Sequence, residues 1–273
     1  MDLLLLFKAA IMGLVEGITE FLPISSTGHL ILAGQLLDFW TIEKREMFAV
    51  AVQIGAIAAV IYEYWGKLWG ALIGGLKGQE QGRRLSLNLI IASVPIVIVG
   101  LTFGDIIKAY LFNAITVAIA LIVGGFIILW AERRPHSIKT QEVDDLTYKQ
   151  ATLIGLIQCL ALFPGTSRSG STIIGSLFLG VSRKAAAEFS FFLGIPVLMG
   201  AGLLDMYKMR ADLHSNDMAV LAVGIIVAFI SALIVIRALI RYVSKHDFTA
   251  FAYYRIGFGL FILVTWWTGW VSW

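Results

Sequence analysis

Two carboxylates, a run of hydroxyl residues and a histidine lie within a hydrophobic N-terminal stretch, from Gly13 to Leu30. Glu16 and Glu20 are four residues apart, so a helix places both on one face. Their oxygens are the hard ligands that Mg²⁺ or Ca²⁺ binds. A charged side chain at the centre of a bilayer costs at least about 2.5–3.5 kcal/mol on insertion scales. This density of polar groups therefore indicates a functional site, although a buried carboxylate kept for structure alone is the alternative for each glutamate.

The hydroxyl residues follow a proline that breaks the first helix. Ser26 is the candidate nucleophile, with Ser25 or Thr27 as the fallback. A serine attacks only when a base removes its proton, and Glu20 or His29 is the candidate base. His29 follows Ser26 by three residues and shares its helical face. A lone histidine is more often a packing residue, but this one lies beside two glutamates and a hydroxyl group, which favours acid–base chemistry.

A second polar break runs from Pro164 to Thr172. Its small hydroxyl residues and glycines leave backbone N–H groups free at a helix start, which is typical of an anion site. Arg168 adds a planar guanidinium suited to phosphate oxygens. The alternative is a capped helix with Arg168 paired to a structural carboxylate, and Arg168 could hold Glu20 when the site is empty. The predicted phosphate-binding residues are Ser25, Thr27, Thr166, Ser167, Ser169 and Thr172.

The composition indicates an integral membrane protein. The 273 residues are 59% hydrophobic and 14% charged, whereas a soluble domain has about 25% charged residues. The formal net charge of +3 is small, and we expect no nucleic-acid partner. The one cysteine, Cys159, excludes an intrachain disulfide. The N-terminus lacks a basic region and a small-residue cleavage site, so we expect no removable signal peptide.

The apolar segments predict two hairpins and six spans. We expect two half-helices that enter and leave the membrane, because the glutamates and the proline interrupt the apolar sequence. These half-helices are residues 3–22 and Thr27 to Leu37. The first two spans are expected to be joined by a basic, glycine-rich loop that contains Lys67 and Arg83. The predicted spans are Phe48 to Trp65, Leu87 to Phe103 and Ala114 to Trp130 in the first half, and Ala185 to Tyr207, Met218 to Ile240 and Phe251 to Trp270 in the second.

The second half begins like the first. Gly155 to Gln158 echoes Gly13 to Glu16, and the proline and serine features recur with one residue deleted before the proline. Coincidence in a chain rich in Gly and Leu is the alternative. A hairpin does not change sides and three spans do, so the halves must have opposite topology. The predicted fold is all-α, with two inverted-topology repeats, each a re-entrant helical hairpin plus three transmembrane helices. We expect one membrane domain over 1–273, made of repeat one (1–131), a cytoplasmic loop (132–149) and repeat two (150–273).

The distribution of positive charge predicts the orientation. Most Lys and Arg residues of the short loops fall on the side that holds the predicted loop 132–149, and such loops are cytoplasmic. Both termini and the first hairpin then face outward, and the second hairpin enters from the cytoplasm.

The two polar breaks closely resemble the motifs of the bacterial undecaprenyl-diphosphate phosphatases of the bacitracin-resistance type. The (E/Q)xxxE motif of that family matches Glu16 to Glu20, and its PxSSTGH segment matches Pro23 to His29. Its PGxSRSxxT motif matches Pro164 to Thr172, with Thr166 at the variable place. The resemblance covers essentially the whole chain. It implies removal of the terminal phosphate of undecaprenyl diphosphate, a divalent cation, and an outward-facing site in the bacterial cytoplasmic membrane, for recycling of the peptidoglycan lipid carrier.

These features together predict a mechanism. Arg168, backbone N–H groups and Mg²⁺ or Ca²⁺ neutralise the phosphoryl charge, and Ser26 or a water attacks in line. Gln158 and Leu162 stand where the first half has its glutamates, so we expect one site per chain. The partners are then a polyprenyl diphosphate and membrane lipids, and the oligomeric state stays open, a dimer included. The alternative is a polyprenyl-phosphate transporter, which would not need the set of carboxylate, serine and histidine.

Overall fold

The structure, a computed structural model, describes the chain except for residues 1, 136, 211–212, 215–216 and 272–273. The described residues form helices and contain no strand; an isolated parallel bridge joins Thr140 and Val181. The helices are α1 (Leu3–Thr19), α2 (Ser26–Leu36), α3 (Ile42–Glu63), α4 (Trp65–Leu76), α5 (Glu80–Leu111), α6 (Ala114–Arg133), η1 (Val143–Asp145), α7 (Tyr148–Gln158), η2 (Cys159–Leu162), α8 (Arg168–Phe178), α9 (Arg183–Lys208), α10 (Met218–Val243) and α11 (Thr249–Thr268).

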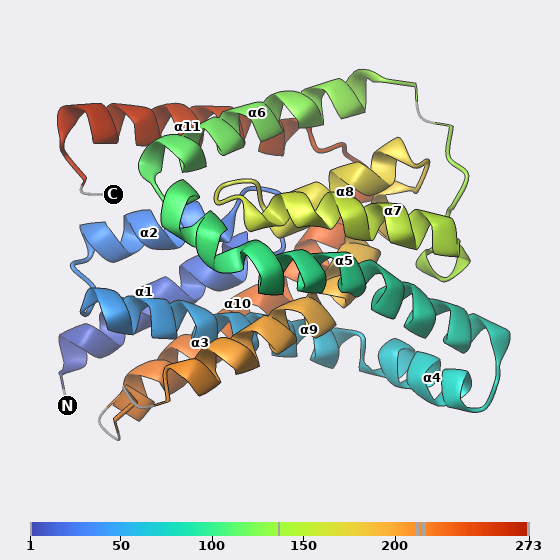
Figure 1. The fold of residues 1–273 in the computed structure, drawn as a ribbon, viewed down its shortest axis with the longest axis horizontal. Coiled ribbons are helices and arrows are strands. Elements are labelled where there is room, and N and C mark those ends of the chain that lie inside the picture. The colour runs from blue at the N-terminus through green and yellow to red at the C-terminus, as the bar shows by residue number, and fades with distance from the viewer. Residues whose placement is uncertain (1, 136, 211–212, 215–216, 272–273) are drawn as a thin grey trace.

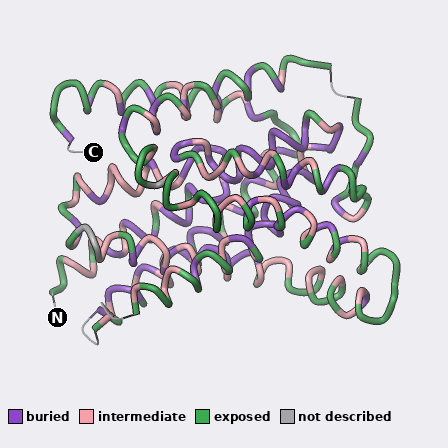
Figure 2. The backbone as a smooth tube through the Cα atoms, in the orientation of Figure 1, coloured by how far each residue is buried: buried purple, intermediate pink, exposed green. Residues whose placement is uncertain are grey.

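Six of the described helices are long and apolar enough to cross a membrane, namely α3, α5, α6, α9, α10 and α11. They coincide with the six predicted spans, which confirms an all-α, multi-pass membrane protein. Large apolar side chains such as Ile98 and Leu101 of α5 are exposed, as expected for a surface that faces lipid. Buried residues gather where the helices cross in the middle of the molecule (Figure 2).

The connection between the first two spans is not the predicted loop. Trp65–Leu76 form the helix α4, which a break at Tyr64 separates from α3. Gly74 and Gly75 have no side chain, so α4 packs closely against the start of α5 near Gly82. The glycines that suggested a loop instead permit close helix packing.

Each half begins with a helix, a break and a second helix. These hairpins are α1–α2 in the first half and α7–η2–α8 in the second, and their breaks meet near the middle of the molecule (Figure 1). The chain enters α1 and leaves α11 at one end of the molecule, whereas the connection from α6 to α7 lies at the opposite end (Figure 1). The two hairpins therefore approach the centre from opposite ends.

The helix contacts are compatible with the predicted inverted repeats. The first hairpin helix of each half packs on the middle span of the other half, α1 on α10 and α7 on α5, while α3 contacts α9 and α6 contacts α11. The echoed glycines lie at these crossings. A Cβ on Gly13 would be 2.4 Å from the Gly224 carbonyl oxygen, and a Cβ on Gly155 would be 2.6 Å from that of Ala92.

The two breaks share an unusual backbone conformation. Ser25 and Ser167 precede α2 and α8 with φ of 70° and 73°, and a non-glycine residue held in so sparsely populated a region costs about 1–3 kcal/mol. Each follows the echoed glycine of its half by the same number of residues. The predicted one-residue deletion is thus wrong: only the proline is displaced, and Ser26 corresponds to Arg168.

The glycine crossings lead to a stability prediction. Gly155→Ala should lower the free energy of unfolding by about 1–3 kcal/mol, because the new methyl group overlaps the backbone of α5. Gly104→Ala, in open space on α5, is the matched control and should be neutral or stabilising. Melting temperatures in detergent measure both, and equal values would contradict the close crossing.

Candidate active site

A polar cavity of about 140 Å³ lies where the two hairpin breaks meet. Its walls come from both halves of the chain, with the first hairpin, the second hairpin and the spans α3 and α9 each contributing. The lining residues are Glu20, Ser25, Ser26, Thr27, Gln53, Ala161, Phe163, Pro164, Gly165, Ser167, Arg168 and Leu198.

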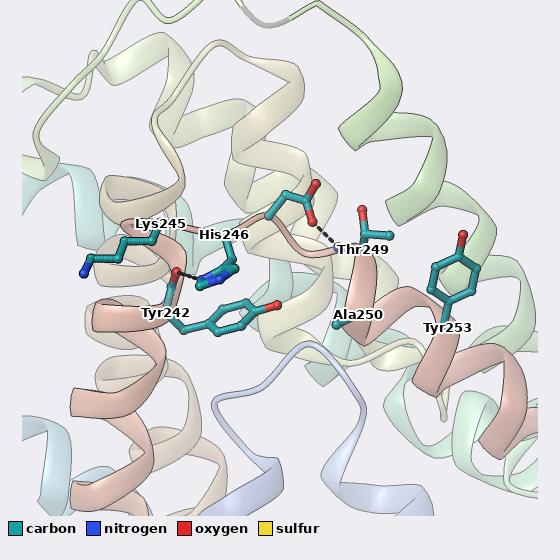
Figure 3. Close-up of a pocket in the computed structure, with 7 residues that line it drawn as sticks. Tyr242, Lys245, His246, Thr249, Ala250 and Tyr253 are labelled. Atoms are coloured by element: carbon teal, nitrogen blue, oxygen red, sulfur yellow. Dashed lines mark hydrogen bonds between the residues drawn. The ribbon is translucent and has the colours of Figure 1, made fainter.

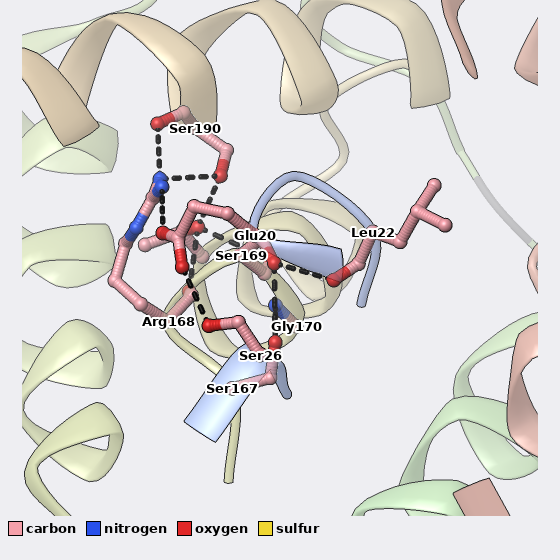
Figure 4. A network of polar contacts seen from close by, with 9 residues as sticks. Glu20, Leu22, Ser26, Ser167, Arg168, Ser169, Gly170 and Ser190 are labelled. Atoms are coloured by element: carbon pink, nitrogen blue, oxygen red, sulfur yellow. Dashed lines mark hydrogen bonds and ion pairs between the residues drawn. The ribbon is translucent and has the colours of Figure 1, made fainter. Parts of the chain in front are cut away.

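Glu20 is the centre of the polar network in this cavity (Figure 4). One carboxylate oxygen accepts a hydrogen bond from the Ser26 hydroxyl at 2.7 Å, and the other pairs with Nη2 of Arg168 at 2.8 Å. Glu20 and Arg168 are 6% and 9% exposed. The structure therefore brings a carboxylate, a hydroxyl and a guanidinium together, three of the four residues predicted to be catalytic.

Arg168 is held from a second side by α9. Its Nη1 donates to the carbonyl oxygen of Ser190 at 2.6 Å and to the Ser190 hydroxyl at 3.3 Å. The Thr172 hydroxyl donates to the Ser190 hydroxyl at 2.7 Å, so Thr172 supports the guanidinium indirectly, through Ser190. Sequence reasoning missed Ser190, whose one signal is a hydroxyl group in the apolar stretch of a predicted span.

The predicted phosphate-binding residues separate into two groups. Ser25, Thr27 and Ser167 line the cavity, and the Ser167 hydroxyl also caps α8 by accepting from the Gly170 N–H at 3.0 Å. The others lie outside the lining: Ser169 donates to the Leu22 carbonyl oxygen at 2.8 Å and so joins the two breaks, Thr172 bonds within α8 and to Ser190, and Thr166 offers its carbonyl oxygen to Arg255.

His29 is engaged at both ring nitrogens. Nδ1 lies 2.7 Å from the Ser25 carbonyl oxygen, which can only accept, so Nδ1 carries a proton. Nε2 lies 2.6 Å from the Tyr254 hydroxyl, and the ring stacks on Phe258 with centroids 4.1 Å apart. Among the described contacts, none joins His29 to Ser26. Tyr254 was missed because its partner is far away in the sequence.

Glu16 provides the test of a metal site. Both of its carboxylate oxygens are buried and have no hydrogen-bond partner within the described structure, and it interacts electrostatically with Glu20 and Arg168. No group of three or more His, Cys, Asp or Glu side chains among the described residues could hold an ion by itself. Two carboxylates suit Mg²⁺, which keeps several waters and shares substrate phosphate oxygens. Glu16 and Glu20 therefore fit a divalent cation that binds together with a phosphate.

Two further residues were not assigned to the site. Gln53, interpreted from the sequence as an interhelical hydrogen-bonding residue, lines the cavity, and the described hydrogen bonds include none from its amide group. Arg255 of α11 lies beside both breaks and is 1% exposed. An ionisable residue in a predicted span is itself a functional signal, and this one was overlooked.

A second hollow lies elsewhere, at the turn from α10 to α11 (Figure 3). Its volume is about 510 Å³ and it is open to the surface. None of the predicted site residues lines it. Its lining residues are Tyr242, Lys245, His246, Asp247, Thr249, Ala250 and Tyr253.

The sequence matches a known family over most of its length. The bacitracin resistance protein BacA family matches residues 9–261. This chain belongs to that family. The match to the BacA family includes both breaks, the first five spans and part of α11, so the resemblance carried by the two motifs is confirmed.

Curated relatives cover the whole chain. It is 64% identical to undecaprenyl-diphosphatase 1 of Acinetobacter baylyi, over 100% of both chains. It is 59% identical to undecaprenyl-diphosphatase 2 of Rhodospirillum rubrum, over 100% of this chain and 99% of that one. It is 58% identical to the undecaprenyl-diphosphatase of Nitrosomonas europaea, with the same coverage. The chain is thus similar along its full length to proteins that bear this name.

The support of Arg168 by α9 leads to a second stability prediction. Ser190→Ala should lower the free energy of unfolding by about 1–3 kcal/mol, because the Thr172 hydroxyl and one guanidinium N–H lose a buried partner. Ser176→Ala is the matched control, since Ser176 is equally buried but donates only within α8. If chemical denaturation gives equal losses, the Ser190 hydroxyl does not contribute to holding the guanidinium.

Proposed function

We propose that this chain hydrolyses undecaprenyl diphosphate to undecaprenyl phosphate and inorganic phosphate. The observation that carries the proposal is the position of Glu20, which accepts a hydrogen bond from the Ser26 hydroxyl at 2.7 Å and pairs with Arg168 at 2.8 Å in one buried cavity. A base, a nucleophile and a phosphate-binding cation are what phosphoryl transfer needs. The names of the relatives state the same activity.

Glu20 is the proposed base. Its carboxylate takes the proton of Ser26, or of a water in the place of Ser26, and the oxygen attacks the terminal phosphorus in line. The bond from that phosphorus to the bridging oxygen breaks, and undecaprenyl phosphate leaves with the bridging oxygen. Where Ser26 attacks, a water then hydrolyses the phosphoserine. His29, held between Ser25 and Tyr254, is the candidate acid for the leaving group.

Positive groups at the breaks would bind the diphosphate. Arg168 offers a planar guanidinium, whose buried Nε has no partner in the described structure. The starts of α2 and α8 add backbone N–H groups that lack a helical acceptor. These donors are fixed before the substrate arrives, which favours the charge that develops during transfer.

Glu16 and Glu20 would hold Mg²⁺ or Ca²⁺. The bound ion would add positive charge beside the phosphate oxygens. The unpartnered oxygens of Glu16 support this proposal, because a buried carboxylate without a partner is costly.

The cavity is proposed to face the outside of the bacterial inner membrane. Loop charges make the side that holds the α6–α7 connection cytoplasmic, and α1 begins at the opposite end of the molecule (Figure 1). The first hairpin then enters from outside, and the isoprenoid tail of the substrate lies among the lipid-facing spans.

Transport of a polyprenyl phosphate is the second candidate function. The observation that favours it is the pair of broken hairpins meeting at the centre, which is common in transporters. Release of inorganic phosphate from undecaprenyl diphosphate by purified protein in detergent separates the two functions, because a transporter leaves the anhydride bond intact.

Substitution of the glutamates tests the base and the metal. Glu20→Gln should abolish turnover, because an amide cannot take the Ser26 proton, whereas Glu16→Gln should leave partial activity, because an amide oxygen still binds a cation weakly. A chelator should inhibit the wild type, and Mg²⁺ or Ca²⁺ should restore it. Full activity after exhaustive chelation would remove the metal from the mechanism.

Thiol labelling tests the orientation. In a Cys159→Ser background, Asp2→Cys should react with a membrane-impermeant thiol reagent in intact spheroplasts, and Gln141→Cys should not, although both positions are exposed. After the membrane is permeabilised, both should react. The reverse pattern in intact spheroplasts would overturn the outward-facing cavity.

A further inference from the structure

Arg255 is a buried guanidinium that binds backbone carbonyl groups and is 1% exposed. Nη1 donates to the carbonyl oxygens of Pro23 at 3.0 Å and Thr166 at 2.9 Å. The remaining donors reach three more carbonyl oxygens: those of Gly165 and Ala120, each 3.1 Å from Nη2, and that of Leu121, 3.3 Å from Nε.

These carbonyl groups belong to three separate segments. Pro23 is in the first hairpin break, Gly165 and Thr166 are in the second, and the other two are in α6. Among the described residues, no carboxylate forms an ion pair with Arg255. The charge is therefore compensated by carbonyl dipoles alone, and the guanidinium joins the two breaks to each other and to a span.

The neighbouring helices leave room for this guanidinium. A Cβ on Gly124 of α6 would be 2.2 Å from Nη2, and a Cβ on Gly170 of α8 would be 3.0 Å from Nη1. The three atoms nearest to a Cβ at Gly124 all belong to the end of the Arg255 side chain. The absence of a side chain at Gly124 thus leaves the space that the Arg255 guanidinium occupies.

The direction of the carbonyl groups also determines the direction of the amides. A trans peptide is planar, so its C=O and N–H groups point opposite ways. The Thr166 carbonyl points to Arg255, and the N–H group of Ser167 in the same peptide therefore points away from it. That N–H group donates to no described residue, and Ser167 lines the cavity.

We propose that Arg255 is a positioning residue for the diphosphate group. It gathers the carbonyl oxygens of both breaks on its own side, so that the amide group of Ser167 is presented to the anion in the cavity. It does not touch the substrate. This inference rests on the proposed phosphatase function, and it adds a residue from α11 to the site.

The test moves the guanidinium without removing it. Gly124→Ala keeps every hydrogen-bonding group but displaces Nη2, and Gly257→Ala, in open space on α11, is the matched control. Arg255→Lys keeps the charge but replaces a fork of five donors by one ammonium group. The measurements are kcat/KM with undecaprenyl diphosphate, the melting temperature in detergent, and the rise in melting temperature caused by methylenediphosphonate, a diphosphate that cannot be hydrolysed.

We expect Gly124→Ala and Arg255→Lys to be folded and to lose about tenfold to a hundredfold in kcat/KM, which corresponds to one charge-assisted hydrogen bond. Both should also lose the thermal shift caused by methylenediphosphonate, and Gly257→Ala should match the wild type. The proposal is overturned if folded Gly124→Ala and Arg255→Lys keep wild-type kcat/KM and thermal shift. It is equally overturned if their melting temperatures fall while both of those values stay normal, since Arg255 would then be purely structural.

Failure of the proposed function gives a different result. Wild type and Gly257→Ala would then release no phosphate, yet methylenediphosphonate would still raise their melting temperatures, and loss of that rise in Gly124→Ala would still support Arg255. If Gly124→Ala does not fold, Arg255→Lys and its thermal shift decide the question alone.

Discussion

The ion pair between Glu20 and Arg168 is the interaction on which the site depends. It joins a residue of the first hairpin to one of the second, so it forms only when both halves are folded against each other. Removing two charges from water is costly, and a buried pair is tolerated when further hydrogen bonds complete it. Ser26 donates a further hydrogen bond to the Glu20 carboxylate, and Ser190 accepts one from the Arg168 guanidinium. The three residues Glu20, Ser26 and Arg168, which are proposed for catalysis, are thus also part of the network that stabilises the buried pair.

The second constraint is the exposed backbone of the two breaks. At membrane depth every peptide group needs a hydrogen-bond partner. In the two breaks, side chains bind several of the carbonyl groups. Arg255 takes those of Pro23, Gly165 and Thr166, Ser169 takes that of Leu22, and the His29 ring binds that of Ser25. Apart from the Gly170 N–H, which the Ser167 hydroxyl caps, the N–H groups at the starts of α2 and α8 have no acceptor in the described structure. We propose that this excess of donors favours an anion in the cavity.

The spans and the two breaks could be predicted from the sequence because both signals are local. Long apolar runs determine the spans, and charged or hydroxyl residues inside such runs are rare enough to mark a site. The contacts of Ser190 and Tyr254 could not be predicted, because their partners lie far away in the sequence and depend on helix packing. The helix α4 was missed because glycine suggests a loop, while Gly74 and Gly75 permit close packing.

The register of the two halves is the reason for expecting one site per chain. Ser26 and Arg168 occupy the same place, the first residue of the helix that follows a strained serine. Glu16 and Glu20 correspond to Gln158 and Leu162, and the Gln158 amide donates to the Ala92 carbonyl oxygen in the packing of α7 on α5. The first half therefore has the carboxylates and the hydroxyl group, and the second half has the positively charged guanidinium of Arg168. Neither half alone holds the proposed base, nucleophile and phosphate-binding charge, so the proposed chemistry requires both breaks to meet at one cavity.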